Sequence, residues 1–209
     1  MISSSFVEEV RLEDGTMTIT RHDKDPTFIH GKVYKRSFLV EKNIRFDTRL
    51  RYHEDGAFNT VCLMLTTPKY IETPLYLWCW REGSVCRNES FVLKTYDQVM
   101  MQRVAVAEEC ERRGLTKELG DIVAMTFVNA FYDTSKLDWL RPANKTLVEK
   151  AEQAFKGFYK RYKKYYFEYD KKKLAAMMAQ IRPLAVNNGM YIEKWAMKDF
   201  LRHIATEVK

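Results

Sequence analysis

The chain has 209 residues, of which 46% are hydrophobic and 30% are charged, and its formal net charge is +7. This composition describes a soluble globular protein of one or two domains with a core of ordinary size. No apolar run approaches the ~18 residues that a membrane span requires, and Met1–Ser5 lacks the basic start and apolar stretch of a secretory signal. Four cysteines without C-x-x-C spacing are interpreted as reduced, buried thiols of a cytoplasmic protein: Cys62, Cys79, Cys86 and Cys110.

Residues 1–92 mix short β-rich segments, turns and short helices. Alternating segments on both sides of Glu13-Asp14-Gly15 predict a hairpin over Val7–Thr20. The further elements expected here are a strand at Phe28–Tyr34, a short helix capped by Ser37 and ending at Lys42, a helix at Asp55–Leu65, and an extended segment at Tyr70–Trp80 with Pro74 at an edge or bend.

From Ser90 onward, every segment has the period of a helix. Gly114 predicts the end of the first helix, and Asn144 predicts the N-cap of the longest one. The expected elements are helices at Leu93–Arg113, from Thr116, after Asn144, at Lys173–Ile181 closed by Pro183, and at Tyr191–Thr206, with a linker at Trp139–Pro142 and a turn at Asn187–Gly189. Residues 93–209 therefore predict a small α-helical bundle.

Positive charge is concentrated in the segments 156–166 and 171–173, where basic residues are interleaved with aromatic ones. Such a pattern can indicate binding to single-stranded nucleic acid. The spacing favours another interpretation, because apolar residues recur at three- and four-residue steps from Leu147 to Tyr169. We therefore expect most of the aromatic side chains in the core and the lysines on a solvated face, and a nucleic-acid partner is the less favoured interpretation.

The adjacent carboxylates Glu54 and Asp55, followed by Gly56, lie where a polar turn should start a buried helix. One interpretation is an acidic N-terminal cap that interacts favourably with the helix dipole. In the other interpretation, one carboxylate faces outward as a base while its neighbour caps the helix. The segments around the pair favour the second interpretation.

Four blocks follow one another in a fixed order: His30–Leu39, Asn43–Phe46, the pair Glu54-Asp55, and Pro74–Ser84. This order resembles the second half of the catalytic domain of inverting, family-2-type glycosyltransferases of the GT-A fold. The resemblance implies an α/β (α+β-like) fold, with a partial GT-A catalytic domain at residues 1–92 and a helical domain at residues 93–209.

The resemblance also implies roles for individual residues. Asp55 would be the base that takes the proton of the attacking acceptor hydroxyl, and Glu54 would orient Asp55 or contact the acceptor. Four groups would bind the leaving diphosphate of the donor: Lys32, His53, Arg81 and Ser84. The structural alternatives are a strand surface for Lys32, a turn for His53, and an ion pair with Glu82 or Glu72 for Arg81.

The family further implies a nucleotide-binding half and an Asp-x-Asp motif that holds a divalent ion, Mn or Mg, on the donor pyrophosphate. Neither is in its expected place. Asp23-Lys24-Asp25 matches the motif literally, but it lies too late in the family order and beside Pro26, which favours a polar loop. We expect the chain to lack the donor half, to bind nucleotide sugars weakly by itself, and to associate through an exposed edge with a separate chain or as an oligomer.

Three hypotheses of function follow from these patterns. The first is a glycosyltransferase of hexosyltransferase type, which transfers a sugar from a nucleotide-sugar donor to an unknown acceptor with inversion. The second is a catalytically inactive binding or structural module derived from such an enzyme. The third is a nucleic-acid-associated basic protein.

Overall fold

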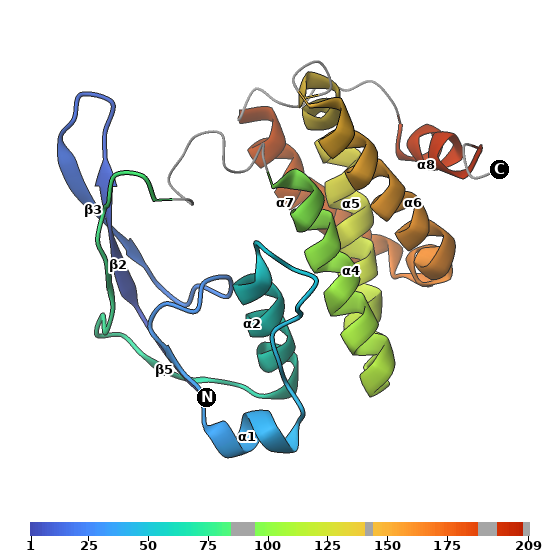
Figure 1. Cartoon of the computed structure of the whole chain (residues 1–209). Coiled ribbons are helices and arrows are strands. Elements are labelled where there is room, and N and C mark those ends of the chain that lie inside the picture. Colours follow the sequence, from blue (N-terminus) through green and yellow to red (C-terminus); the bar gives the residue numbers. More distant parts are fainter. Residues whose placement is uncertain (85–94, 141–143, 188–195, 207–209) are drawn as a thin grey trace. The chain divides into compact units, whose positions relative to one another are not determined.

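The computed structural model describes residues 1–84, 95–140, 144–187 and 196–206. Within it the chain divides into two compact units, Met1–Val92 and Leu93–Lys209. Unit 1 combines strands and helices, and unit 2 is helical (Figure 1). The described residues thus form a mixed α/β protein with two small sheets and seven helices.

Unit 1 contains two three-stranded sheets, with strand orders β4-β1-β5 and β3-β2-β6. Their strands are β1 (Ile2–Ser4), β2 (Phe6–Arg11), β3 (Met17–His22), β4 (Lys32–Val33), β5 (Lys69–Ile71) and β6 (Leu77–Trp78). Only Ser5 separates β1 from β2, and each of these strands pairs in parallel with a strand of the later segment, β5 or β6. One chain path therefore links the two sheets.

Two helices of unit 1, α1 (Arg36–Glu41) and α2 (Glu54–Leu65), lie between β4 and β5 in the chain. Helix α2 buries Phe58, Val61 and Cys62, which form a core cluster with Ile44. Because α2 leads into β5 through a short connection, its first turn lies toward the carboxyl ends of the parallel strands β1 and β5 (Figure 1).

The predicted hairpin is confirmed, since β2 and β3 pair antiparallel from Phe6 opposite His22 to Arg11 opposite Met17. Gly15 has a φ of 84° in the connecting turn, and the Asp14 carboxylate accepts a 2.8 Å hydrogen bond from the backbone N–H of Thr16. Such a left-handed glycine and Asx-type contact are typical of tight turns.

Three expectations for unit 1 need correction. The strand expected at Phe28–Tyr34 covers only Lys32–Val33, because His30 and Gly31 form a turn that is closed by a hydrogen bond from the Lys32 N–H to the carbonyl of Ile29. Ser37 does not cap α1, since the helix starts one residue earlier and its N-cap, Lys35, makes no side-chain cap bond. The extended segment is two short strands, and Pro74, which lacks a backbone donor, lies in the gap between them.

The cysteine expectation also needs correction. Cys62 and Cys110 are buried and belong to no disulfide among the described residues, but Cys79 is exposed. Cys79 follows β6 on the surface of unit 1, where alternation along an extended segment turns every second side chain to solvent. Cys86 lies outside the described residues.

Unit 2 consists of five described helices: α4 (Tyr96–Arg113), α5 (Thr116–Leu140), α6 (Lys145–Glu168), α7 (Lys171–Asn187) and α8 (Met197–Thr206). Helices α4, α5 and α6 pack against one another, α7 packs on α5, and α8 packs on α6 (Figure 1). Gly114 ends α4 in the left-handed conformation, and the Asn144 side chain caps α6 by accepting from the N–H of Leu147. The sequence predicted both boundaries.

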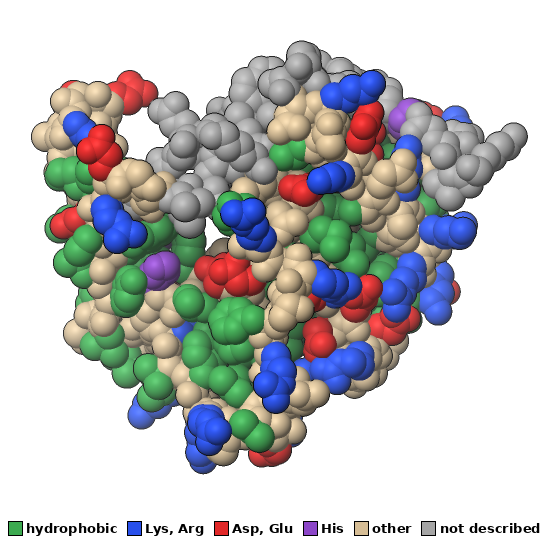
Figure 2. Space-filling model, viewed as in Figure 1, with side chains coloured by type: hydrophobic (Ala, Val, Ile, Leu, Met, Phe, Trp, Pro, Cys, Tyr) green, Lys and Arg blue, Asp and Glu red, His purple; other side chains and the backbone are tan. Residues whose placement is uncertain are grey.

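Most aromatic residues of α6 lie in the core of unit 2, as predicted. Phe155, Phe158, Tyr162 and Tyr166 are buried, whereas Lys160, Lys163 and Lys164 are exposed. Figure 2 shows Lys and Arg side chains, in blue, spread over the surface of the protein. Phe127 of α5 is fully buried and stacks on Tyr166 with 4.5 Å between ring centroids. The interleaving of basic and aromatic residues is therefore the signature of an amphipathic helix.

Two expectations for unit 2 differ from the structure. Pro183 lies inside α7 and does not end it, since a proline removes one helical hydrogen bond and the packing of α7 on α5 offsets that loss. Trp139 and Leu140 belong to the last turn of α5, so they are not linker. The rest of the expected linker, the expected turn after Asn187, and Tyr191 lie outside the described residues. None of the described helices has the length and apolarity that crossing a membrane would require.

Candidate functional site

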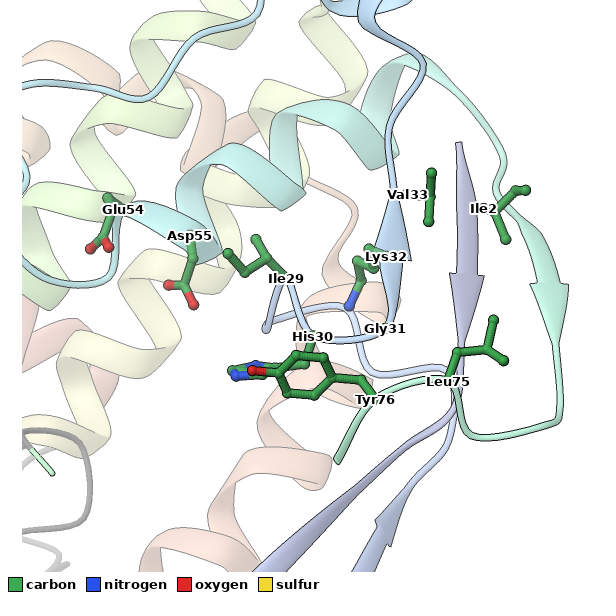
Figure 3. Close-up of a pocket in the computed structure, with 10 residues that line it drawn as sticks. All are labelled: Ile2, Ile29, His30, Gly31, Lys32, Val33, Glu54, Asp55, Leu75 and Tyr76. Carbon is green, nitrogen blue, oxygen red and sulfur yellow. The ribbon is translucent and has the colours of Figure 1, made fainter. Parts of the chain in front are cut away.

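A pocket of about 400 Å³ opens in unit 1 beside the first turn of α2 (Figure 3). It is lined by Ile2, Ile29, His30, Gly31, Lys32, Val33, Glu54, Asp55, Leu75 and Tyr76. Its volume is within the range of small-molecule sites, about 300–1,000 Å³, and its mixture of apolar walls with a few polar groups is typical of them.

The two predicted carboxylates occupy the first turn of α2. The N-cap is His53, which has a φ of 62° and makes no side-chain cap bond, so neither Glu54 nor Asp55 holds the capping position. Histidine is among the residues that enter the left-handed region more readily than most. Both carboxylates still lie at the positive end of the helix dipole, a position that stabilises the start of α2.

Asp55 has one carboxylate oxygen available to a ligand. Its Oδ1 accepts a 2.7 Å hydrogen bond from the Gly56 N–H, and within the part of the chain that the structure describes Oδ2 has no protein donor. In Figure 3 the carboxylate points from the start of α2 toward the rings of His30 and Tyr76. Asp55 can therefore accept a proton or a hydrogen bond in the pocket.

His30 forms an aromatic wall of the pocket. Its ring stacks on Trp78 with 4.7 Å between centroids and meets Tyr76 edge-on at 4.6 Å. Burial lowers the pKa of His30, and the nearby Asp55 carboxylate opposes this effect only in part. The imidazole is therefore neutral at pH 7, and its apolar surroundings dominate its behaviour.

Lys32 is half-buried in the lining of the pocket. Its ammonium donates a hydrogen bond to the carbonyl oxygen of Phe28. Burial lowers the pKa of Lys32, while the carboxylates of Asp25 and Asp55 act in the opposite direction. The pocket thus contains one cationic group whose position is held by the turn that precedes β4.

The Asp-Lys-Asp sequence does not provide a metal site. Asp23 Oδ1 accepts hydrogen bonds from the Ser5 hydroxyl at 2.5 Å and from the Arg21 guanidinium at 2.8 Å. Asp25 Oδ1 accepts from the backbone N–H groups of Thr27 and Phe28 at 2.7 and 2.8 Å. Across the described residues, no group of three or more His, Cys, Asp or Glu side chains could hold a metal ion. The residues present do not fit the Mn or Mg site of the resembled family.

The structure brings three of the six predicted site residues into one pocket, namely Glu54, Asp55 and Lys32. His53, Arg81 and Ser84 do not line it. Arg81 and Ser84 belong to an exposed turn closed by a 3.2 Å hydrogen bond from the Ser84 N–H to the Arg81 carbonyl. Sequence reasoning missed the roles of His30 and Tyr76 as pocket walls, although both lie within the segments that carry the resemblance.

Comparisons with known proteins give no match: no family model matches the chain, and neither the curated proteins nor the solved structures contain a significant match to it.

Proposed function

We propose that unit 1 carries the acceptor side of an inverting glycosyltransferase, with Asp55 as the general base. The observation that carries this proposal is the convergence of Asp55, Glu54 and Lys32 with the rings of His30 and Tyr76 on one pocket of about 400 Å³. Carboxylates accept hydrogen bonds from the hydroxyl groups of a sugar, and flat apolar rings pack against its C–H face. The pocket therefore suits a hydroxyl-rich acceptor such as a saccharide.

The proposed reaction is a displacement at the anomeric carbon of the donor sugar. The acceptor oxygen forms the new bond to this carbon, and the bond from the carbon to the diphosphate oxygen breaks with its electron pair going to the diphosphate. Asp55 Oδ2 takes the hydroxyl proton as the oxygen attacks. Glu54 binds another hydroxyl group of the acceptor. The ammonium group of Lys32 stabilises the negative charge of the leaving diphosphate.

The first experiment is an NMR titration of the ¹⁵N-labelled full chain with a panel of mono- and disaccharides. We expect at least one saccharide to shift the amide signals of Gly31, Lys32 and Asp55. Nucleotide sugars with uridine, guanosine or thymidine diphosphate are expected to bind weakly or not at all without a donor half. Micromolar binding of a nucleotide sugar, or no response of the pocket to any saccharide, contradicts the proposal.

The second experiment is the substitution Asp55→Asn, assayed for transfer together with a chain that supplies the donor half. Loss of a general base lowers the rate about 10²–10⁴-fold. Asparagine keeps the size of the side chain, so only the charge in the first turn of α2 is lost, and stability should fall by at most about 1 kcal/mol. Glu13→Gln, in the exposed turn of the hairpin, is the control that removes one negative charge elsewhere. A large fall in melting temperature with a proportional loss of activity would instead assign Asp55 a structural role.

A binding module without turnover is the second candidate. It is favoured by the apolar rim of the pocket, where Ile29, Leu75 and Tyr76 are exposed. This function predicts saccharide binding that survives Asp55→Asn with no transfer from any donor. The two experiments above therefore separate the candidates.

A further inference from the structure

Strand β3 is the edge of its sheet and has an unusually apolar exposed surface. The strand order β3-β2-β6 leaves one side of β3 without a strand partner among the described residues. Ile19 is 67% exposed and Met17 is 48% exposed. The strand contains no Lys, Pro or Gly, the residues that commonly protect an edge from pairing with another chain.

The hydrogen-bond pattern defines which backbone groups of β3 face outward. The N–H of Leu12 bonds to the carbonyl of Thr16, and these residues are opposite each other in the hairpin. Because antiparallel pairs alternate, Thr18, Thr20 and His22 also bond to β2. The N–H and C=O groups of Met17, Ile19 and Arg21 therefore point away from the sheet.

This edge is complementary to itself. If two copies of β3 pair antiparallel about a two-fold axis at Ile19, then Ile19 faces its own copy, and Met17 faces Arg21 of the second copy. All outward backbone groups of these three residues then gain partners. On the other face, Thr18 meets Thr20 of the second copy, and cross-strand threonine pairs are favourable. No two like charges lie directly opposite each other.

We propose that β3 is a self-association edge through which two copies of the chain form a symmetric dimer with one continuous sheet. The geometry favours a second copy over another partner, because the two-fold register places Ile19 opposite Ile19 and threonine opposite threonine. Arg21 is the only charged residue among the three outward residues, and in this register it lies opposite Met17. An isologous contact of this kind closes on itself. The proposal concerns a different surface from the pocket and does not depend on its chemistry.

The decisive experiment is disulfide trapping in full-length chains that carry Cys79→Ser and Cys86→Ser. In this register the two Ile19 Cα atoms are about 5.5 Å apart, within the ~4.4–6.8 Å that a disulfide spans. Ile19→Cys should therefore give a covalent dimer under mild oxidation. Met17→Cys is the matched control, because its two copies are offset by about 13 Å along the strands and should remain monomeric.

Sedimentation of the unmodified chain supplies an independent readout. We expect a concentration-dependent monomer–dimer equilibrium, and Ile19→Lys should raise the dimer Kd at least ~tenfold because two ammonium groups then meet on the axis. Since Ile19 is exposed, this variant should keep its fold, which circular dichroism checks. A chain that stays monomeric at all concentrations, or equal trapping of Ile19→Cys and Met17→Cys, overturns the proposal. If β3 pairs with another protein instead, the chain by itself will sediment as a monomer at all concentrations.

Discussion

Gly31 holds the turn that carries His30 and Lys32 against strand β1. Its φ is 65°, and a Cβ at this position would lie 2.6 Å from Ser4 Oγ and 3.1 and 3.2 Å from the carbonyl oxygens of Ser4 and Ser5. The Gly31 carbonyl accepts hydrogen bonds from the N–H and the hydroxyl of Ser4, at 2.8 and 2.9 Å. The close approach of the two backbones therefore requires glycine and positions one side of the pocket.

Gly31→Ala should destabilise unit 1 by about 2–4 kcal/mol, because left-handed strain adds to the clash with β1. Gly83→Ala is the matched control. Gly83 has a φ of 73° with nothing within 4 Å of the added Cβ, so this change carries only the left-handed strain and should cost about 1–2 kcal/mol. The measurement is urea unfolding followed by NMR signals of unit 1. Equal effects of the two substitutions would refute the close packing at Gly31.

His30 predicts a pH dependence of stability. Burial lowers its pKa in the folded state below the ordinary value of 6.5. As pH falls through 6.5, the unfolded chain therefore takes up a proton at His30 that the folded chain does not. Stability from this residue is constant above that pH and decreases below it, until the lower pKa of the folded state is reached.

The variant His30→Phe isolates this contribution. Phenylalanine keeps a ring among Phe6, Phe28 and Trp78 but cannot bind a proton. We expect unit 1 of the variant to lose less unfolding free energy than the wild type between pH 7.5 and pH 5. The other histidines affect both proteins alike, so parallel stability curves would show that His30 titrates with its ordinary pKa.

At the scale of elements, the length of a periodic pattern decides what the sequence predicts. The aromatic stripe of α6 repeats over 24 residues with a capping asparagine, and the hairpin has a turn signal between alternating strands, so both were predicted correctly. Strands β4, β5 and β6 have only two or three residues, too few for a period, and pairing with β1 and β2 determines them. The local β-propensity of two or three residues does not predict with which strand they pair.

The same limit explains the partial prediction of the pocket. Asp55 and Lys32 carry charge in distinctive segments, so the sequence points to them directly. His30 and Tyr76 become pocket walls only because β6 and the turn before β4 converge beside α2, which requires pairings between residues far apart in the chain. Arg81 and Ser84 were expected in the site by block order alone, and an exposed turn keeps them out of the pocket.

Helix α6 offers a direct test of the amphipathic interpretation. Phe158 is 2% exposed and Phe167 is 60% exposed, although both lie on the same helix. Phe158→Ala should cost about 3–5 kcal/mol of the stability of unit 2 through lost burial and a cavity. Phe167→Ala should change stability by less than ~0.5 kcal/mol. Thermal unfolding followed by the helical signal measures both, and similar losses would contradict a one-sided core.

At the scale of the molecule, the positive charge is unevenly distributed along the chain. Residues 145–173 contain ten Lys or Arg and four Asp or Glu, so they account for six of the seven net positive charges. Most of these lysines are exposed along α6 and at the start of α7. A surface of this kind attracts polyanions without sequence preference, whether or not a polyanion is the natural partner.

The hypothesis of a nucleic-acid-associated protein can be tested through this distribution. We expect weak, sequence-independent binding of double-stranded DNA that disappears between about 50 and 200 mM salt, since phosphate contacts release counterions. Replacing Lys160, Lys163 and Lys164 by Gln should reduce the slope of log K against log salt by about 1 per lysine that contacts a phosphate. Fluorescence anisotropy with a labelled duplex measures both slopes.

The matched control for that experiment replaces three exposed lysines of unit 1, Lys35, Lys42 and Lys69, by Gln. Both triple variants have a net charge three units below +7, so a difference between them reports the location of charge and not its total. If the α6 face is a solvated surface with only generic attraction, the α6 variant loses most of the weak binding and the control loses little. Affinity that persists at 200 mM salt, or that depends on base sequence, would require base contacts that a row of lysines cannot provide, and would place the nucleic-acid hypothesis above the saccharide pocket.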